Sequence, residues 1–263
     1  MEIPAPSHWR RGEFISDLHL HGAGPKTFSA WREYLLHANA DAVFILGDLF
    51  EVWVGDDAAN IPLSFEQQCV EVLRASSARR PLYLMRGNRD FLMGPTLAAA
   101  AHCTLLEDPT VLVFGGERWL LSHADDLCLD DTAYMAFRAT VRTIEWQTEF
   151  LAKPLNERID IARSIRAQSE ARKQTTVTYA DVDSTAAIAL LNQTNTTTLI
   201  HGHTHRPQTH ALAHGLQRVV LSDWDLDAAP QRAEVLRLTI GSAGNNIVLD
   251  RVRPVSVSPT PAD

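Results

Sequence analysis

Cysteine is scarce in this sequence and forms no recognisable pattern. The three cysteines, Cys69, Cys103 and Cys128, are spread over 263 residues without any Cys-x-x-Cys pair. Disulfide frameworks and thiolate zinc sites both require cysteines in pairs or at short spacings. The sequence therefore predicts free thiols in a reducing compartment, and it excludes a metal site built from sulfur ligands.

Long apolar runs are missing as well. No segment approaches the roughly 18 consecutive apolar residues that a membrane-spanning helix needs. Residues 1–11 also lack the apolar core of a signal peptide. We therefore expect a cytosolic chain.

Basic residues are fewer than acidic ones: the chain has 24 lysines and arginines and 32 acidic residues, so its net charge is −8. A nucleic-acid partner normally requires a basic face, so we expect none. A phosphorylated substrate is not excluded, since bound metal ions reverse the local sign of the charge. The remaining composition, 45% apolar and 21% charged, is typical of a soluble globular protein.

The first half of the chain alternates short apolar runs with helical patterns. The apolar runs at 14–17, 42–46 and 82–85 are separated by helical stretches at 29–38 and 65–78. This alternation predicts β-α-β units. Further strands are expected at 111–114, 118–122, 198–201, 218–221, 234–239 and 247–251, the first two forming a hairpin through Gly115 and Gly116.

These patterns indicate one α/β domain over residues 12–252, with irregular tails at 1–11 and 254–263. From residue 131 to residue 196 the pattern is almost entirely helical, which predicts a helical insertion. Within it, residues 138–173 hold eight basic and five acidic residues, so this segment is +3 and the rest of the chain −11. The insertion is either a solvated helical surface or a lid that docks an amphipathic, anionic partner.

Seven polar side chains follow the predicted strands at the points where those strands end. They are Asp17, His19, Asp48, Asn88, His123, His203 and His205. Singly, each is more often a hydrogen-bonded loop residue, but open α/β sheets bind ligands at the carboxyl ends of their strands. So many polar groups in one place are costly without a partner, which indicates metal ions. Oxygen and imidazole donors suit manganese, iron or zinc, and seven ligands fit two ions if Asp48 bridges them.

Five ordered blocks carry a resemblance to a known family. Asp-x-His (17–19), Gly-Asp (47–48), Gly-Asn-Arg-Asp (87–90), the later His123 and Gly-His-Thr-His (202–205) resemble the calcineurin-like metallophosphoesterases. The segments 45–57, 87–92, 127–134 and 201–207 are similar to the UDP-2,3-diacylglucosamine pyrophosphatases of lipid A biosynthesis in Gram-negative bacteria. The resemblance implies an α/β (α+β) fold, a four-layer β-sandwich core flanked by helices, with a helical lid.

The resemblance also implies roles for individual residues. One metal ion, typically Mn²⁺ in this family, would be held by Asp17, His19, Asp48 and His205, and the other by Asp48, Asn88, His123 and His203. Arg89 would bind phosphate in bidentate fashion and act in catalysis with Asp48, Asn88 and His203. Substrate contacts are implied for Asn88, Arg89, Asp131, Ser169 and His203.

Two places depart from the family pattern. Ala124 stands where the family usually has a glycine, a small change that we expect to be tolerated. In the insertion the family has Ser followed by Asn and Lys, whereas this chain has Ser169, Arg172, Lys173 and Thr175. Arg172 or Lys173 is therefore expected to supply the cation of the lid.

The implied reaction is hydrolysis of the pyrophosphate bond of UDP-2,3-diacylglucosamine by attack of metal-activated water on the α-phosphorus. The products would be UMP and 2,3-diacylglucosamine 1-phosphate. Such an amphiphilic substrate implies peripheral attachment to the cytoplasmic side of the inner membrane through the basic insertion, and no obligate protein partner is inferred. Two alternatives remain open, namely another dinuclear metallophosphoesterase (nucleotide phosphodiesterase, nuclease or protein phosphatase) and a catalytically inactive scaffold.

Overall fold

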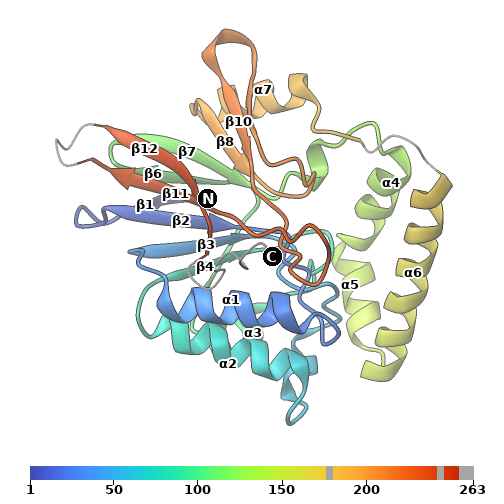
Figure 1. Cartoon of the computed structure of the whole chain (residues 1–263). Helices are drawn as coiled ribbons and strands as arrows, with labels where there is room; N and C mark the ends of the chain where they lie inside the picture. The colour runs from blue at the N-terminus through green and yellow to red at the C-terminus, as the bar shows by residue number, and fades with distance from the viewer. Residues whose placement is uncertain (176–179, 242–245, 255–263) are drawn as a thin grey trace.

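Two six-stranded sheets pack face to face at the centre of the protein (Figure 1). The computed structural model describes residues 1–175, 180–241 and 246–254, with the side chains of 168–175 left out. The first sheet has the order β12 (Ile247–Val252), β11 (Val235–Ile240), β2 (Arg11–Ile15), β3 (Ala42–Leu46), β4 (Leu82–Met85) and β5 (Thr104–Leu106). The second has the order β1 (Glu2–Pro4), β6 (Thr110–Phe114), β7 (Glu117–Ser122), β8 (Thr198–His201), β10 (Gln217–Val220) and β9 (Thr209–Ala211).

The first sheet is built on the predicted β-α-β units. Strands β2 to β5 are parallel, and helices α1 (Pro25–His37), α2 (Phe65–Ser77) and α3 (Pro95–Ala101) connect them. All five side chains of β3 are buried, which explains its continuous apolar sequence. Phe44 faces the other sheet and stacks on Phe14 with ring centroids 4.9 Å apart, whereas Val43 and Ile45 face the helices.

The second sheet contains the predicted hairpin. Strands β6 and β7 are antiparallel and are joined by Gly115 and Gly116, with φ values of 61° and 81°. Two consecutive positive φ angles are typical of the tight turn that matches the twist of a hairpin, and glycine adopts them without strain. Helix α7 (Ser184–Gln193) covers the outer face of this sheet through the fully buried Ala187 and Leu191. The layers are therefore helix, sheet, sheet and helix, as the resemblance implied.

Two expectations about the edges of the fold were wrong. Residues 1–11, predicted to be irregular, contain β1, which pairs in parallel with β6 while Ile3 packs against the core between the sheets. The predicted insertion at 131–196 is also too long, because α7 belongs to the core. Of the expected tail at 254–263, residues 255–263 lie outside the described part of the chain.

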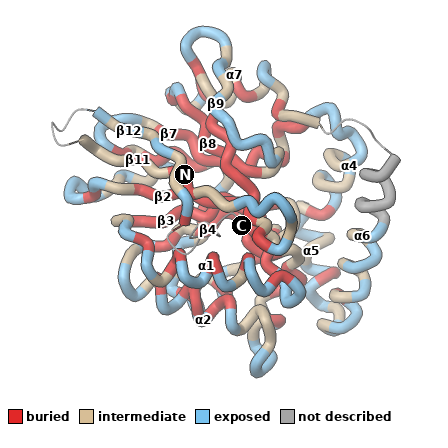
Figure 2. Tube along the Cα trace, in the orientation of Figure 1, coloured by how far each residue is buried: buried red, intermediate tan, exposed pale blue. Residues whose placement is uncertain are grey.

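The remaining helices of the insertion stand beside the sheets. Helices α4 (Thr132–Val141), α5 (Ile144–Leu151) and α6 (Leu155–Thr175) lie next to one another at one end of the sandwich (Figure 1). Their surfaces are mostly exposed or half-buried, whereas the strands beside them are buried (Figure 2). We refer to α4, α5 and α6 as the lid. Short 3₁₀ turns occur at η1 (Asp56–Asn60), η2 (Asp125–Leu127) and η3 (Ala213–Gly215).

Two further findings bear on the sequence expectations. All three cysteines are free, as predicted, although Cys103 is only half-buried. None of the helices in the described ranges is both long enough and apolar enough to pass through a bilayer.

Candidate active site

Loops from both sheets meet at one edge of the sandwich, where strands β2, β3, β4, β7 and β8 end. These loops bring together all seven side chains singled out in the sequence: Asp17, His19, Asp48, Asn88, His123, His203 and His205. Because parallel strands end at the same edge of a sheet, residues far apart in sequence become neighbours there.

Sharp backbone turns aim these side chains at one another. Left-handed φ angles occur at Asp17 (54°), His19 (47°), Asp48 (51°), His203 (68°) and His205 (51°). Such a conformation costs about 1–2 kcal/mol for a residue with a side chain, so it persists only where the surroundings enforce it. Backbone hydrogen bonds enforce it here; for example, the amide of His19 donates to the carbonyl of Asp48 at 3.0 Å.

One group of donors consists of Asp17, His19 and His205. The Nε2 atom of His205 lies 3.3 Å from Asp17 Oδ1 and 3.3 Å from His19 Nε2. Asp17 is fully buried, so water does not stabilise its charge. Lone pairs this close repel one another unless a proton or a cation lies between them. The group therefore fits a divalent cation.

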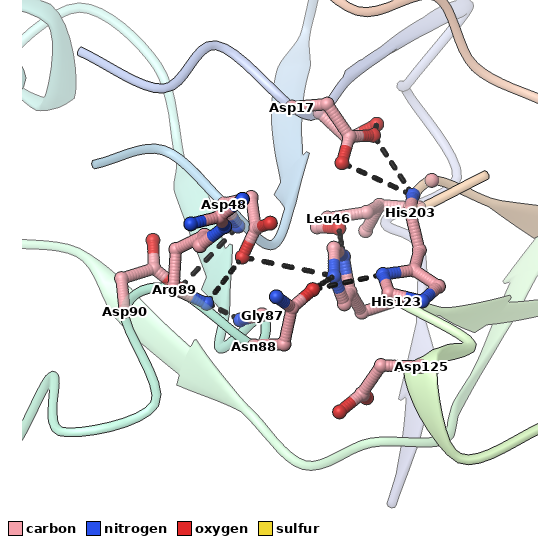
Figure 3. A network of polar contacts seen from close by, with 12 residues as sticks. Asp17, Leu46, Asp48, Gly87, Asn88, Arg89, Asp90, His123, Asp125 and His203 are labelled. Carbon is pink, nitrogen blue, oxygen red and sulfur yellow. Dashed lines mark hydrogen bonds and ion pairs between the residues drawn. The ribbon is translucent and has the colours of Figure 1, made fainter. Parts of the chain in front are cut away.

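A second group of donors is formed by Asn88, His123 and His203 (Figure 3). Asn88 Oδ1 lies 2.8 Å from His203 Nδ1 and 3.1 Å from His123 Nε2. The other ring nitrogen of His123, Nδ1, is 3.0 Å from the carbonyl oxygen of Leu46. A carbonyl only accepts, so Nδ1 carries a hydrogen and Nε2 is directed at the cluster.

Asp48 lies between the two groups. Its Oδ1 is 3.7 Å from His123 Nε2, and its Oδ2 is 4.0 Å from His19 Nδ1. Asp17, Asp48 and His123 also offer ligand atoms that all lie within 4.8 Å of one another. A carboxylate with one oxygen toward each group suits a bridge between two cations. The donors are oxygen and imidazole nitrogen throughout, which fits divalent first-row metals.

Two glycines make this close packing of donors possible. A Cβ atom on Gly87 would overlap the carboxylate of Asp48, and one on Gly47 would overlap the imidazole of His123. Gly47 also has a φ of 88°, which side chains disfavour. Glycine is therefore required for steric reasons at both positions, directly before Asp48 and directly before Asn88.

The charges of the cluster shift the pKa values of its members. Burial raises the pKa of Asp48 to about 7, although His123 opposes the shift. For Asp17, burial is outweighed by the hydrogen bond and charge of His205, and its pKa lies below the ordinary value. For His123, burial is outweighed by the carboxylates of Asp48, Asp17 and Asp125, which raise its pKa to about 9.

Metal binding should accordingly be pH-dependent. At neutral pH the metal-free protein holds a proton on His123, and a cation at Nε2 must displace it. We expect the apparent Mn²⁺ affinity to rise about tenfold per pH unit from pH 7 to pH 8, and more steeply below pH 7, where Asp48 binds a second proton. Calorimetric titration in buffers of different ionisation enthalpy measures the protons released. An affinity that does not change over this range would contradict the predicted displacement.

Asp90 is a functional residue that the sequence reasoning missed. Its carboxylate accepts backbone hydrogen bonds from Gly87 at 2.7 Å, Leu49 at 2.8 Å, and Asp48 and Phe50 at 3.3 Å each. It therefore joins the loop that carries Asp48 to the loop that carries Asn88. Asp90 ends the Gly-Asn-Arg-Asp block, but nothing in the sequence shows that its partners are backbone amides.

Of the other predicted residues, Arg89 is the one that the described contacts place beside this cluster. The backbone amide of Arg89 donates to Asp48 Oδ1 at 2.8 Å, and its guanidinium lies 3.6 Å from Glu51 Oε1. Asp131 caps the N-terminus of α4 by accepting from the amide of Tyr134 at 3.0 Å. The remaining residues, Ser169, Arg172, Lys173 and Thr175, lie on the last turns of α6, and their side chains are outside the described part of the structure.

The sequence of this chain is similar to those of known proteins. Residues 14–207, which contain all seven donors, match the family model of the calcineurin-like phosphoesterases. The UDP-2,3-diacylglucosamine hydrolase of Chromohalobacter salexigens is 44% identical over 217 residues, which are 80% of this chain and 87% of the relative. The enzyme of the same name from Chromobacterium violaceum is 47% identical over 220 residues, which are 80% of this chain and 89% of the relative.

A solved dimetal phosphatase from Danio rerio is similar to this chain with a TM-score of 0.48 and 12% identity, over 88% of this chain and 92% of that one. The family model covers residues 14–207 and so includes every donor of the cluster. Each of the two relatives is matched over 80% of this chain and over most of its own length. The chain therefore belongs to the calcineurin-like phosphoesterase family.

Proposed function

We propose that this protein hydrolyses the pyrophosphate bond of UDP-2,3-diacylglucosamine and releases UMP and 2,3-diacylglucosamine 1-phosphate. The observation that carries the proposal is a cavity of about 310 Å³ lined in part by Glu51, whose carboxylate lies 3.4 Å from the donor His19. A phosphoester-cleaving cluster beside a largely apolar cavity suits a substrate with a diphosphate and acyl chains. The names of the two relatives support the same substrate.

The cavity lies between the lid and the core. Helix α6 contributes one face, because residues spaced by three or four lie on one side of a helix. The lining includes Leu155, Ile159, Arg163 and Arg166 of α6, and Phe50, Trp53, Ile61 and Phe65 from the segment between β3 and the first residue of α2. We infer that the apolar part receives the acyl chains and that the arginines face the phosphates.

The donor cluster would hold two divalent cations, for which we propose Mn²⁺. One would be bound by Asp17, His19, Asp48 and His205, and the other by Asp48, Asn88, His123 and His203. Bound cations of this kind supply an activated water molecule and neutralise the charge of the diphosphate.

The other groups of the chain bind and orient the substrate. Arg89 would bind a phosphate group of the substrate, because a guanidinium donates two parallel hydrogen bonds to phosphate oxygens. Asn88 and His203 lie beside it and would position the same phosphoryl group. We assign the sugar and the second phosphate to Asp131 at the start of α4 and to Ser169, Arg172, Lys173 and Thr175 at the end of α6.

A turnover assay tests the proposal directly. We expect Mn²⁺-dependent release of UMP from UDP-2,3-diacylglucosamine, and much slower hydrolysis of bis(p-nitrophenyl) phosphate, a diester without acyl chains. Comparable rates for both substrates would favour another dinuclear phosphoesterase. A chain that binds Mn²⁺ and hydrolyses neither would reject the proposed reaction.

Heavy-oxygen labelling tests which phosphorus is attacked. We propose direct attack of water on the α-phosphorus, which breaks its bond to the bridging oxygen and leaves the new oxygen on UMP. Hydrolysis in ¹⁸O-water should therefore place one label in UMP and none in the sugar phosphate, as measured by mass spectrometry. Label in the sugar phosphate alone would contradict attack at this position.

We also propose peripheral binding to the cytoplasmic surface of the inner membrane. Ile61 lines the cavity and is 47% exposed, and Leu63 next to it is 88% exposed. The segment 138–173, which contains most of the lid, has a net charge of +3, and its Lys153, which pairs with Glu157, is 41% exposed. Apolar contacts with lipid tails, together with attraction to anionic head groups, would hold the enzyme at its substrate.

Substitution of Leu63 by serine tests this surface. Burying a leucine contributes about 1.5–3 kcal/mol, so the variant should bind anionic phosphatidylglycerol vesicles roughly tenfold more weakly in a sedimentation assay. Val248 on β12, which is 40% exposed, provides a matched control as Val248→Ser. Equal vesicle binding by Leu63→Ser and the unsubstituted protein would rule out this loop as the membrane contact.

A further inference from the structure

Glu51 is a carboxylate beside the donor cluster whose role the family motifs leave unassigned. It follows β3 in the same loop as Asp48, and its side chain is only 16% exposed. Adding negative charge opposite an anionic substrate is unfavourable by itself. The contacts of Glu51 show what offsets this cost.

The backbone fixes Glu51 next to His19. The amide of Glu51 donates to the carbonyl of Leu20 at 3.1 Å, and the amide of Leu20 donates to the carbonyl of Leu49 at 2.9 Å. Residues 18–20 and 48–51 therefore run side by side in a parallel arrangement that extends the pairing of β2 and β3. The position of Glu51 relative to the metal ligand is set by this register.

The side chain of Glu51 faces Nδ1 of His19, the ring nitrogen that also lies 4.0 Å from Asp48 Oδ2. His19 directs Nε2 at His205, and its Nδ1 lies 3.4 Å from Glu51 Oε2. Metal-bound histidines usually donate their other ring hydrogen to a carboxylate or a carbonyl, which fixes the tautomer and makes the ligand more basic. His123 has such a partner in the carbonyl of Leu46. The buried Nδ1 of His19 makes no hydrogen bond in this structure, and Glu51 Oε2, at 3.4 Å, is a carboxylate oxygen placed to accept from it.

Glu51 also pairs with two arginines. Arg89 Nη1 lies 3.6 Å from Glu51 Oε1, and Arg166 on the lid contacts the same oxygen. Two guanidinium groups this close repel each other unless an anion lies between them. The single carboxylate therefore holds a core arginine and a lid arginine together at the edge of the cavity.

The base of α6 is anchored to the same loop. Arg158, which is 3% exposed, donates to the carbonyl of Val54 at 2.6 Å and forms an ion pair with Asp57. The helix thus contacts the loop after β3 at two levels, through Arg158 and through Arg166. Of these two contacts, the one between Arg166 and Glu51 lies next to a metal ligand, His19.

We propose that Glu51 is a positioning residue that orients His19 for metal binding and holds Arg89 and Arg166 for phosphate binding. The part that concerns the arginines rests on the proposed function, whereas the part that concerns His19 requires only the metal site. Glu51 would thereby connect α6 of the lid to the metal site.

The test compares Glu51→Ala, Glu51→Gln and the unsubstituted chain in two titrations. The first measures Mn²⁺ affinity by calorimetry, and the second measures binding of orthophosphate to the Mn²⁺-loaded protein. Alanine removes the acceptor for His19 and should weaken Mn²⁺ binding roughly 10- to 100-fold. Glutamine keeps an acceptor oxygen but loses the charge, so Mn²⁺ affinity should stay within about threefold while orthophosphate affinity falls about tenfold.

Glu71→Gln on the exposed side of α2 is the matched control, and circular dichroism of the metal-free proteins checks folding. Equal loss of Mn²⁺ affinity in the alanine and glutamine variants, or tighter orthophosphate binding by Glu51→Gln, would overturn the inference. Neither titration uses the lipid substrate. A failure of the turnover assay would therefore reject the proposed reaction and leave this result standing.

Discussion

Asp48→Asn is expected to lower kcat/KM for UDP-2,3-diacylglucosamine by about 10³-fold or more. Asp48 directs one carboxylate oxygen at each donor group, at 3.7 Å from His123 Nε2 and 4.0 Å from His19 Nδ1. An amide offers one oxygen and a poorly binding NH₂, so the variant loses the bridge between the cations. Metal-derived stabilisation of a phosphoryl transition state is worth several kcal/mol, and each 1.4 kcal/mol is about tenfold in rate.

The loss should be seen in metal content as well as in rate. We expect Asp48→Asn to bind fewer than two Mn²⁺ per chain at saturation, measured by equilibrium dialysis. Asp250→Asn on β12, an exposed position, is the matched control and should bind and turn over like the unsubstituted protein. Full activity of Asp48→Asn with two bound Mn²⁺ would show that Asp48 is not the bridging ligand.

Asp90→Ala is expected to lower the free energy of unfolding by about 3–5 kcal/mol, the cost of leaving buried partners of a charged group unpaired. The carboxylate is fully buried and accepts from four backbone amides, and no water reaches it to replace them. These amides belong to the loops that carry Asp48 and Asn88. The variant should therefore lose Mn²⁺ affinity along with stability.

Urea denaturation of the metal-free protein measures the change in stability. Asp183→Ala is the matched control, because Asp183 accepts from one amide at the N-terminus of α7. Loss of a single helix cap typically costs about 1 kcal/mol. If Asp90→Ala is no less stable than Asp183→Ala, the four hydrogen bonds do not hold the site together.

The strands of the core were the most predictable part of the fold. Strands β3, β4 and β8 occupy 42–46, 82–85 and 198–201, the ranges that the sequence predicts. Side chains on both faces of each strand are buried, apart from the half-buried Tyr83, and each strand contains an apolar run that ends before a glycine or a polar residue. The donors were predictable because each follows a predicted strand. Asp48, Asn88, His203 and His205 follow these three strands, Asp17 and His19 follow β2, and His123 follows β7.

Elements whose place depends on distant contacts were not predictable. Strand β1 has three residues, and its pairing with β6 joins segments about a hundred residues apart in sequence, which no local pattern reveals. Helix α7 has the same apolar pattern as a lid helix, and only its contact with β8 assigns it to the core. The roles of Asp90 and Glu51 were hidden too, because backbone amides and outer ring nitrogens leave no signature in a sequence.

We propose that seven donors from five loops hold two divalent cations, with Asp48 between them. Diffraction from crystals grown with Mn²⁺, recorded at the manganese absorption edge, locates such cations. We expect two anomalous peaks about 3.5–4 Å apart, the spacing of two-metal sites, one beside His19 and His205 and one beside Asn88 and His123. A map with no peak in the cluster, or with a single peak that Asp48 does not contact, would show that these residues do not form a two-metal site.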